Sequence, residues 1–241
     1  MNIPVGAEAI DHQSQIVVVE LQKCRDWLGY SYTANGWHYS GATIKQYILN
    51  PQLTYNDSIL KIYYEKFQPK SLIEALFIKN NKITIPNDEQ WPALPWLHVA
   101  YKPRNSNYQH FGPNPDHYGK TEFSKTIDLY KKLSKNGYQP KSHRDGFIRG
   151  YFLKHYDDYR FVVSGGQHRI AALAMLGYKN IEVKIQPSYQ RVIDIQKVHK
   201  WINVRNNKYN QEEAIQIFNL YFNENGKNKA KKIGIYSKIY M

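Results

Sequence analysis

Residues 159–185 constrain the fold of this chain more than any other stretch of its sequence. The run at 161–163, Phe-Val-Val, is aromatic and β-branched and is typical of a short buried strand. Ser-Gly-Gly at 164–166 breaks that run. The apolar residues of 170–177 then recur at helical spacing and end at a glycine suited to a C-cap. A second β-rich run follows at 181–185. The sequence therefore predicts strand, glycine turn, helix and strand in immediate succession.

The glycine turn brings together groups that bind anions. Gly165 and Gly166 let the backbone turn sharply and let another molecule approach it closely. The helix that begins after them leaves N–H groups without helical partners, and its dipole adds partial positive charge. Gln167, His168 and Arg169 add an amide, an imidazole and a guanidinium. This combination predicts a phosphate-binding turn. In the alternative interpretation, the glycines only shape the turn and the arginine pairs with a nearby acid.

The same residues carry a resemblance to a known superfamily. Phe-Val-Val-Ser-Gly-Gly-Gln-His-Arg-Ile-Ala-Ala-Leu-Ala-Met-Leu-Gly at 161–177, followed by Ile-Glu-Val-Lys-Ile at 181–185, resembles the signature of the ParB/sulfiredoxin-like superfamily. Leu-Ser-Lys-Asn-Gly-Tyr-Gln-Pro at 133–140 is similar to the segment that leads into that family's next strand. The resemblance implies an α+β fold, with a small mixed sheet and flanking helices around a nucleotide-binding core.

The resemblance divides the chain into three segments. Residues 1–108 form a predicted N-terminal extension packed on the core, 109–186 form the ParB/sulfiredoxin-like core, and 187–241 form a C-terminal helical segment with a basic tail. The lysines of this tail either grip a polyanion or are simply solvated. Within the extension, the aromatic stretch at 27–39 is open to two interpretations, a binding surface or a packed aromatic layer. Within the core, a helix with a basic face is expected to begin at Thr121.

The first residues of the turn limit the chemistry that the family resemblance implies. Sulfiredoxins carry a redox cysteine where this chain has Gln167, and an amide cannot act as that nucleophile, so sulfiredoxin activity is excluded. Free-serine kinases resemble this turn but begin it with an acidic residue, whereas this chain has Gly165 there. A kinase role therefore needs an acid or base from elsewhere. The unranked candidates are Asp145, Asp157, Asp158 and Glu182.

Nucleic acid is the alternative partner. ParB-type partition proteins hold CTP with a Gly-Glu-Arg-Arg turn and add a helix-turn-helix domain, and this sequence shows neither. A further branch, linked to DNA modification, carries Asp-Gly-Gln-His-Arg and shares residues 166–169 with this chain. The formal net charge of +13 favours polyanionic partners. A DNA-binding or DNA-processing protein that holds phosphates with the same turn is therefore the second hypothesis.

Our leading hypothesis is a phosphotransferase or NTPase. The resemblance implies that ATP, or another nucleoside triphosphate, is bound, and phosphoryl transfer then requires a divalent ion, Mg²⁺, to offset its charge. The acceptor is unknown; a small hydroxylated metabolite fits the size of the chain and its aromatic N-terminal region. The predicted nucleotide-binding residues are Gly165, Gly166, Gln167, His168, Arg169, Lys125 and Lys132. The predicted catalytic residues are Gln167, which would orient the nucleophile, and His168 and Arg169, which would contact the β- and γ-phosphates. No protein metal-ligand set is predicted, because the histidines lack ligand spacing.

Composition indicates a folded protein of a reducing compartment. Hydrophobic residues make up 42% of the chain, more than disordered proteins contain. The single cysteine, Cys24, cannot form an internal disulfide. No stretch is long and apolar enough for a membrane span, and the first residues lack a signal-peptide pattern. We therefore expect a cytoplasmic protein with no membrane partner.

Overall fold

The computed structural model describes residues 3–4, 6–7, 16–78, 83, 90–100, 102, 108–144, 146–186 and 190–236. Its strands are β1 (Ile16–Glu20), β2 (Cys24–Arg25), β3 (Ile148–His155), β4 (Asp158–Gly165), β5 (Asn180–Ile185) and β6 (Val192–Asp194). Its α-helices are α1 (Tyr39–Leu49), α2 (Ile59–Lys66), α3 (Leu72–Leu76), α4 (Asp116–Asn136), α5 (Gln167–Met175), α6 (Ile202–Arg205), α7 (Gln211–Asn223) and α8 (Lys227–Lys232). Short 3₁₀ helices are η1 (Leu21–Lys23), η2 (Pro140–Ser142) and η3 (Ile195–Lys200). Across these residues, no helix has both the length and the apolar character needed to cross a bilayer.

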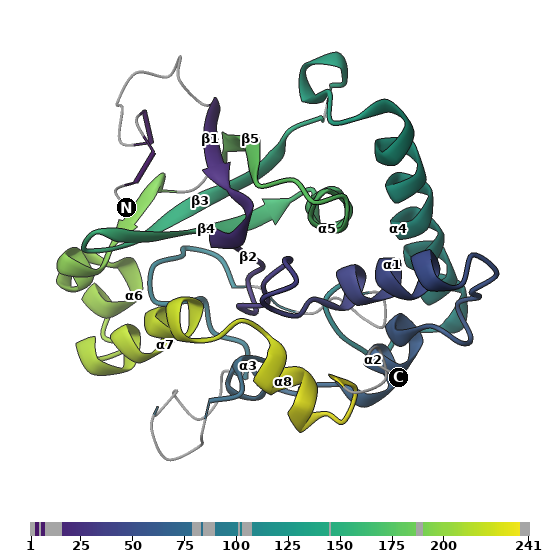
Figure 1. The fold of residues 1–241 in the computed structure, drawn as a ribbon. Helices are drawn as coiled ribbons and strands as arrows, with labels where there is room; N and C mark the ends of the chain where they lie inside the picture. Colours follow the sequence, from purple (N-terminus) through teal and green to yellow (C-terminus); the bar gives the residue numbers. More distant parts are fainter. Residues whose placement is uncertain are drawn as a thin grey trace.

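Within the described residues, six strands form one mixed sheet in the order β1-β5-β3-β4-β2, with β6 paired to β3 (Figure 1). β3 and β4 form an antiparallel hairpin. β5 lies parallel to the first half of β3, and β6 lies parallel to its second half. The predicted α+β class with a mixed sheet and surrounding helices is therefore confirmed.

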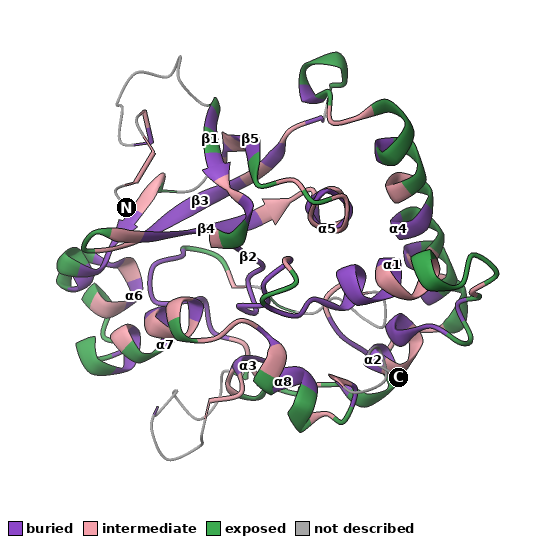
Figure 2. Ribbon diagram, in the orientation of Figure 1, coloured by how far each residue is buried: buried purple, intermediate pink, exposed green. Residues whose placement is uncertain are grey.

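Neighbouring side chains along β3 and β4 belong to two hydrophobic clusters, one on each face of the sheet. Phe152 and Phe161 pack with the apolar side of α5. Tyr151 and Val162 pack on the other face, with the N-terminal aromatic residues and the buried sides of α2, α3 and α7. Figure 2 shows β3 and β4 buried along most of their length. Because strand side chains alternate between faces, a sheet covered on both faces produces the continuous apolar runs seen in the sequence.

The sheet draws strands from all three segments of the predicted division. β1 pairs with β5 and β2 pairs with β4, so the residues before 109 supply both ends of the strand order. β6, from the residues after 186, pairs with β3. The N-terminal segment therefore completes the sheet in addition to packing on it.

The predicted start of the long core helix at Thr121 is wrong. α4 begins at Asp116, more than a turn earlier, with Pro115 as its N-cap residue. Proline suits this place because its fixed φ is compatible with a helix start and it lacks the N–H that would remain unpaired. Asp116 adds a carboxylate to the first turn, where the helix dipole is positive. The earlier start places Glu122 well inside the helix.

The lysine-rich C-terminal segment is not uniformly solvated. α8 carries exposed Lys231 and Lys232, as the sequence indicates. Lys229, however, is only 2% exposed. Its ammonium group donates to the Leu28 carbonyl and lies 5.2 Å from the centre of the Tyr30 ring. Neither interpretation of the basic tail holds for Lys229, which is buried and anchors α8 to the N-terminal segment.

Candidate functional site

The glycine turn at the end of β4 has the geometry that the sequence predicts. Gly166 is the N-cap residue of α5, has a φ of 90°, and carries no side chain that could cap the helix. A Cβ atom there would lie 3.2 Å from the Arg169 guanidinium and 3.2 Å from the Ile148 backbone. Glycine is therefore required at 166, both for the backbone conformation and for the close approach of Arg169. The first N–H groups of α5 point out of this turn, as at any helix start.

Gln167 faces the interior of the protein. It is 7% exposed, and its amide donates to the Val163 carbonyl over 2.8 Å. The Tyr32 hydroxyl donates to the Gln167 amide oxygen. These contacts tie the first residue of α5 to the preceding strand and to the N-terminal segment. The prediction that Gln167 orients a nucleophile does not fit this placement, because its amide is directed at protein groups.

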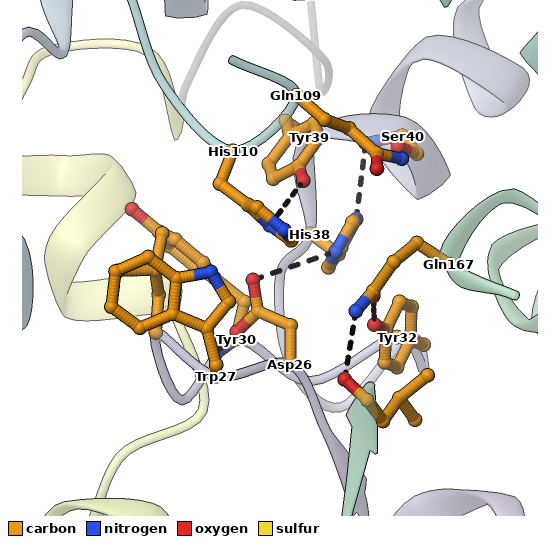
Figure 3. Close-up of polar contacts among 12 residues, drawn as sticks. Asp26, Trp27, Tyr30, Tyr32, His38, Tyr39, Ser40, Gln109, His110 and Gln167 are labelled. Atoms are coloured by element: carbon orange, nitrogen blue, oxygen red, sulfur yellow. Dashed lines mark hydrogen bonds and ion pairs between the residues drawn. The ribbon is translucent and has the colours of Figure 1, made fainter. Parts of the chain in front are cut away.

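A buried polar network lies behind Gln167 (Figure 3). The His38 ring is stacked between Tyr32 and Tyr39, with centroid distances of 4.3 and 4.2 Å. Burial lowers the pKa of His38 well below its ordinary value, and its Nδ1 accepts from the Ser40 N–H over 3.1 Å. Its Nε2 faces Asp26 Oδ2 at 3.8 Å, beyond hydrogen-bonding distance. Of the two interpretations of residues 27–39, the structure confirms the packed aromatic layer, which supports the turn from behind.

His168 is held by α4. Its Nε2 lies 3.0 Å from Glu122 Oε2 and 3.0 Å from the Gln109 amide, and its Nδ1 lies 2.9 Å from the Thr126 hydroxyl. Thr126 donates its own proton to the Glu122 carbonyl, so its oxygen accepts from Nδ1. Nδ1 therefore faces an acceptor, whereas Nε2 faces both the Glu122 carboxylate and the Gln109 amide nitrogen, which is a donor. These contacts fix the position of the His168 ring on this face.

Glu122 is the buried acid of this cluster. It is 4% exposed and accepts from Lys125 over 2.8 Å as well as from His168. Burial alone would raise the pKa of Glu122, but the hydrogen bonds from His168 and Lys125 outweigh it, so the pKa lies below its ordinary value. The carboxylate is therefore ionised at neutral pH and fixes the positions of both side chains.

We expect Glu122→Gln to lower the free energy of unfolding by about 1–3 kcal/mol at neutral pH, because it weakens two charge-assisted hydrogen bonds. A depressed folded-state pKa contributes stability above the unfolded value of 4.5, and this contribution is lost as the pH falls through the folded value. The difference from wild type should therefore shrink in acid. Urea unfolding at several pH values measures it. Glu65→Gln, at an exposed carboxylate, is the control. If it lowered the free energy of unfolding as much as Glu122→Gln does, Glu122 would not stabilise the protein through its bonds to His168 and Lys125.

A cavity of about 700 Å³ opens over the middle of α4, beside His168. Lysines of α4 and hydroxyl groups dominate its lining. These residues are Lys120, Lys125, Lys132, Thr121 and Ser124. Ammonium and hydroxyl groups in this density suit an anion with several charges.

A second cavity, of about 490 Å³, lies over the last turns of α4 and reaches the turn before β3. Arg169 lines it together with Tyr138, Pro140 and Leu133. Leu129 and Lys132 line both cavities, so the two adjoin along α4. We call the pair the α4 groove. His168 enters one half of the groove and Arg169 enters the other, with the start of α5 between them. Sites of this size accommodate small molecules and cofactors.

The structure therefore brings together most of the predicted site residues. His168, Arg169, Lys125 and Lys132 line the α4 groove, whereas Gln167 is buried behind it. Sequence reasoning missed the residues that hold His168. These are Glu122, Thr126 and Gln109. Glu122 and Thr126 are four residues apart and so share a helix face, but this signal points to His168 only once the packing of α4 against α5 is known.

The predicted acid or base candidates lie elsewhere. Asp157 and Asp158 lie at the opposite end of the eight-residue β4 from the turn, about 23 Å away at the usual rise per residue. Asp158 is already bonded to Lys23 and Arg160. Glu182 lies 3.4 Å from Lys141. Asp145 lies outside the described residues. None of the three described candidates lines the α4 groove.

Comparisons of the chain with protein-family models, with curated proteins and with solved structures found no match.

Proposed function

We propose that the protein binds ATP, or another nucleoside triphosphate, in the α4 groove and transfers or hydrolyses its terminal phosphoryl group. One observation carries the proposal. Consecutive residues at the start of α5, His168 and Arg169, reach the two halves of one groove, and Lys132 of α4 lies where the halves meet. A helix start with cations on both sides suits a chain of phosphates. The resemblance of residues 109–186 to the ParB/sulfiredoxin-like superfamily supports the same assignment.

The two halves of the groove suit different parts of a nucleotide. The second cavity combines the apolar surface of Leu133, Tyr138 and Pro140 with the polar groups of Gln139 and Ser142. That mixture favours a base and a ribose. The first cavity offers lysines and hydroxyl groups, which favour phosphates. In this orientation the α-phosphate lies near Arg169, and the terminal phosphate lies near His168 and Lys125.

Phosphoryl transfer needs little from a protein beyond positioning and positive charge. Arg169 would hold phosphate oxygens through two parallel N–H donors, and Lys132 and His168 would stabilise charge that develops on the terminal group. Glu122 would keep His168 and Lys125 in place. Mg²⁺, when bound with the nucleotide, supplies further neutralisation of the phosphates. The acceptor is a hydroxyl group of a small metabolite, or water. A cytoplasmic location belongs to the same proposal.

Calorimetric titration with ATP, GTP and CTP in the presence of Mg²⁺ tests the proposal, followed by an assay of phosphate release with and without hydroxylated metabolites. We expect saturable binding of at least one nucleotide at one site per chain. Binding without release of phosphate would leave a nucleotide-binding protein without turnover. No binding of any of the three nucleotides would contradict the proposal.

A second candidate function rests on the exposed lysines of α4, some of which also line the α4 groove. Lysines along this helix are exposed over its whole length: Lys120, Lys125, Lys131, Lys132 and Lys135. Such a row suits the phosphates of duplex DNA. Affinity for duplex DNA, measured between low and physiological salt, separates the candidates. A steep fall with salt, together with tight binding at physiological salt, would favour DNA; weak binding at physiological salt would favour the nucleotide.

A further inference from the structure

One aromatic side chain is held firmly in the wall of the α4 groove. Tyr138 follows the end of α4, after Gly137, whose φ of 70° ends the helix. The Tyr138 backbone N–H donates to the Tyr178 hydroxyl over 3.3 Å. At the far end of its side chain, the Tyr138 hydroxyl donates to the Glu182 carbonyl over 3.0 Å and accepts from the Ile148 N–H over 3.2 Å. These bonds hold the side chain against β3 and β5.

The bonds of Tyr138 determine which part of it faces the groove. The side chain is half-buried, packs on the cluster that contains Phe152 and Phe161, and lines the second cavity. Because its hydroxyl is engaged by the strands, the part that remains for the cavity is the aromatic ring. Leu133 and Pro140 line the same cavity and add apolar surface. The second cavity therefore offers an apolar wall that contains a fixed ring.

A fixed ring suits a planar ligand. An aromatic side chain can stack on any nucleobase, because every base has a π-face. Apart from its cations and Tyr138, the described polar side chains of this cavity are exposed: Asn136, Gln139, Ser142 and His143. Water competes for such groups, so their hydrogen bonds contribute little net energy to the choice of a base.

We infer that Tyr138 is the stacking surface for the nucleotide base, and that the α4 groove accepts nucleoside triphosphates with little distinction among their bases. This inference rests on the proposed nucleotide site. It adds the residue that recognises the base, and it separates the ligand class from phosphate chains that carry no base.

Calorimetric titration of wild type with ATP, GTP, CTP and inorganic tripolyphosphate, each with Mg²⁺, measures what the base contributes. The affinities for the nucleotides should lie within about tenfold of one another, because stacking tolerates any base. Tripolyphosphate carries the phosphates without base or ribose, so it should bind at least about tenfold more weakly than ATP. A larger preference for one nucleotide would show that hydrogen bonds select the base, and would overturn the inference.

Two variants of Tyr138 isolate the ring. Tyr138→Leu should lower the affinity for ATP about tenfold and leave the affinity for tripolyphosphate unchanged, because leucine keeps apolar volume and loses the stacking surface. Tyr138→Phe loses the same hydroxyl bonds but keeps the ring, so it should restore most of the affinity for ATP. Tyr130→Leu is the matched control, because it removes a half-buried tyrosine of α4 that lines neither cavity. It should match wild type with both ligands.

The outcomes separate this inference from the proposed function. If wild type binds neither the nucleotides nor tripolyphosphate, both are wrong. If wild type binds ATP and tripolyphosphate equally tightly, the base makes no contact, and the inference is overturned while the phosphate-binding groove stands. If Tyr138→Leu weakens both ligands equally, Tyr138 only holds the turn after α4. If Tyr138→Leu binds ATP as tightly as wild type, the base lies elsewhere. Either result also overturns the inference.

Discussion

Replacing Arg169 with alanine should weaken ATP binding by about 10- to 100-fold. A hydrogen bond to a charged group contributes about 1.5–3 kcal/mol, and each 1.4 kcal/mol corresponds to about a tenfold change in affinity. Arg169 lines the half of the groove that contains Tyr138, and its charge acts to lower the pKa of that tyrosine against the larger, opposing effect of burial. Calorimetry with Mg²⁺ measures the affinity. The affinity of Arg169→Lys for ATP should lie between those of wild type and Arg169→Ala, because lysine keeps the charge and loses the planar pair of donors.

Arg144→Ala is the matched control for Arg169→Ala. Arg144 is exposed in the turn after η2, near the second cavity but outside its lining. The Arg144→Ala substitution removes the same charge from a position near the second cavity, so it should change ATP affinity by less than about twofold. If Arg169→Ala remained folded and bound ATP as tightly as wild type, the nucleotide would not lie against the start of α5.

The largest expected effect on stability comes from Lys229. Replacing it with methionine should lower the free energy of unfolding by about 3 kcal/mol at slightly alkaline pH, because it leaves a buried carboxylate without its cation. Burial raises the pKa of Asp26 to about 7, and the charge of Lys229 acts against that rise. Burial likewise lowers the pKa of Lys229 to about 8, and Asp26 acts against that fall. Lys229 joins α8 to the turn that begins at Asp26 by donating to the Leu28 carbonyl.

The deficit of Lys229→Met should grow as the pH rises from about 6 to about 8. The folded-state pKa of Asp26 lies above its unfolded value of 3.8, so the stability from this group is fully present below 3.8 and is lost as the pH rises through about 7. Loss of Lys229 raises that folded-state pKa further, so the variant loses more stability over this range. The lowered pKa of Lys229 also makes the deficit of the variant grow with pH. Wild type gains stability as this lysine deprotonates, and the variant cannot.

Urea unfolding of Lys229→Met, Asp26→Asn and the double variant tests this account. The double variant should be less destabilised than the sum of the single variants, since it leaves neither charge buried alone. Lys231→Met, at an exposed lysine of the same helix, should change the free energy of unfolding by less than about 0.5 kcal/mol. Asp26 and Lys229 would not interact if the effects of the two single variants added up in the double variant. The same conclusion would follow if the stability deficit of Lys229→Met shrank toward alkaline pH.

Local sequence pattern predicted the centre of this fold well. The end of β4, the glycine turn and α5 are contiguous, and each is specified by neighbouring residues: a β-branched run, an obligatory glycine at 166, and apolar spacing. The closing glycine also behaves as expected, since the Gly177 and Tyr178 N–H groups donate back to the carbonyls of Ala174 and Leu173. Such features need no knowledge of distant parts of the chain.

The rest of the site depends on contacts between distant residues. Gln167 looked like a ligand-binding residue from its place in the turn, but Tyr32, 135 residues away, receives it in the interior. Glu122 went unnoticed because its importance comes from His168, 46 residues later. Lys229 looked solvated because its neighbours are lysines, and only the packing of α8 on residues 26–30 buries it. Composition and periodicity do not encode these pairings.

A crystal structure of the protein with a non-hydrolysable ATP analogue and Mg²⁺ tests the central claim most directly. We predict phosphate oxygens within hydrogen-bonding distance of the first N–H groups of α5 and of the Arg169 guanidinium, with the base in the cavity beside Tyr138. An analogue bound away from α4 and α5, with the start of α5 unchanged and unbound, would contradict it.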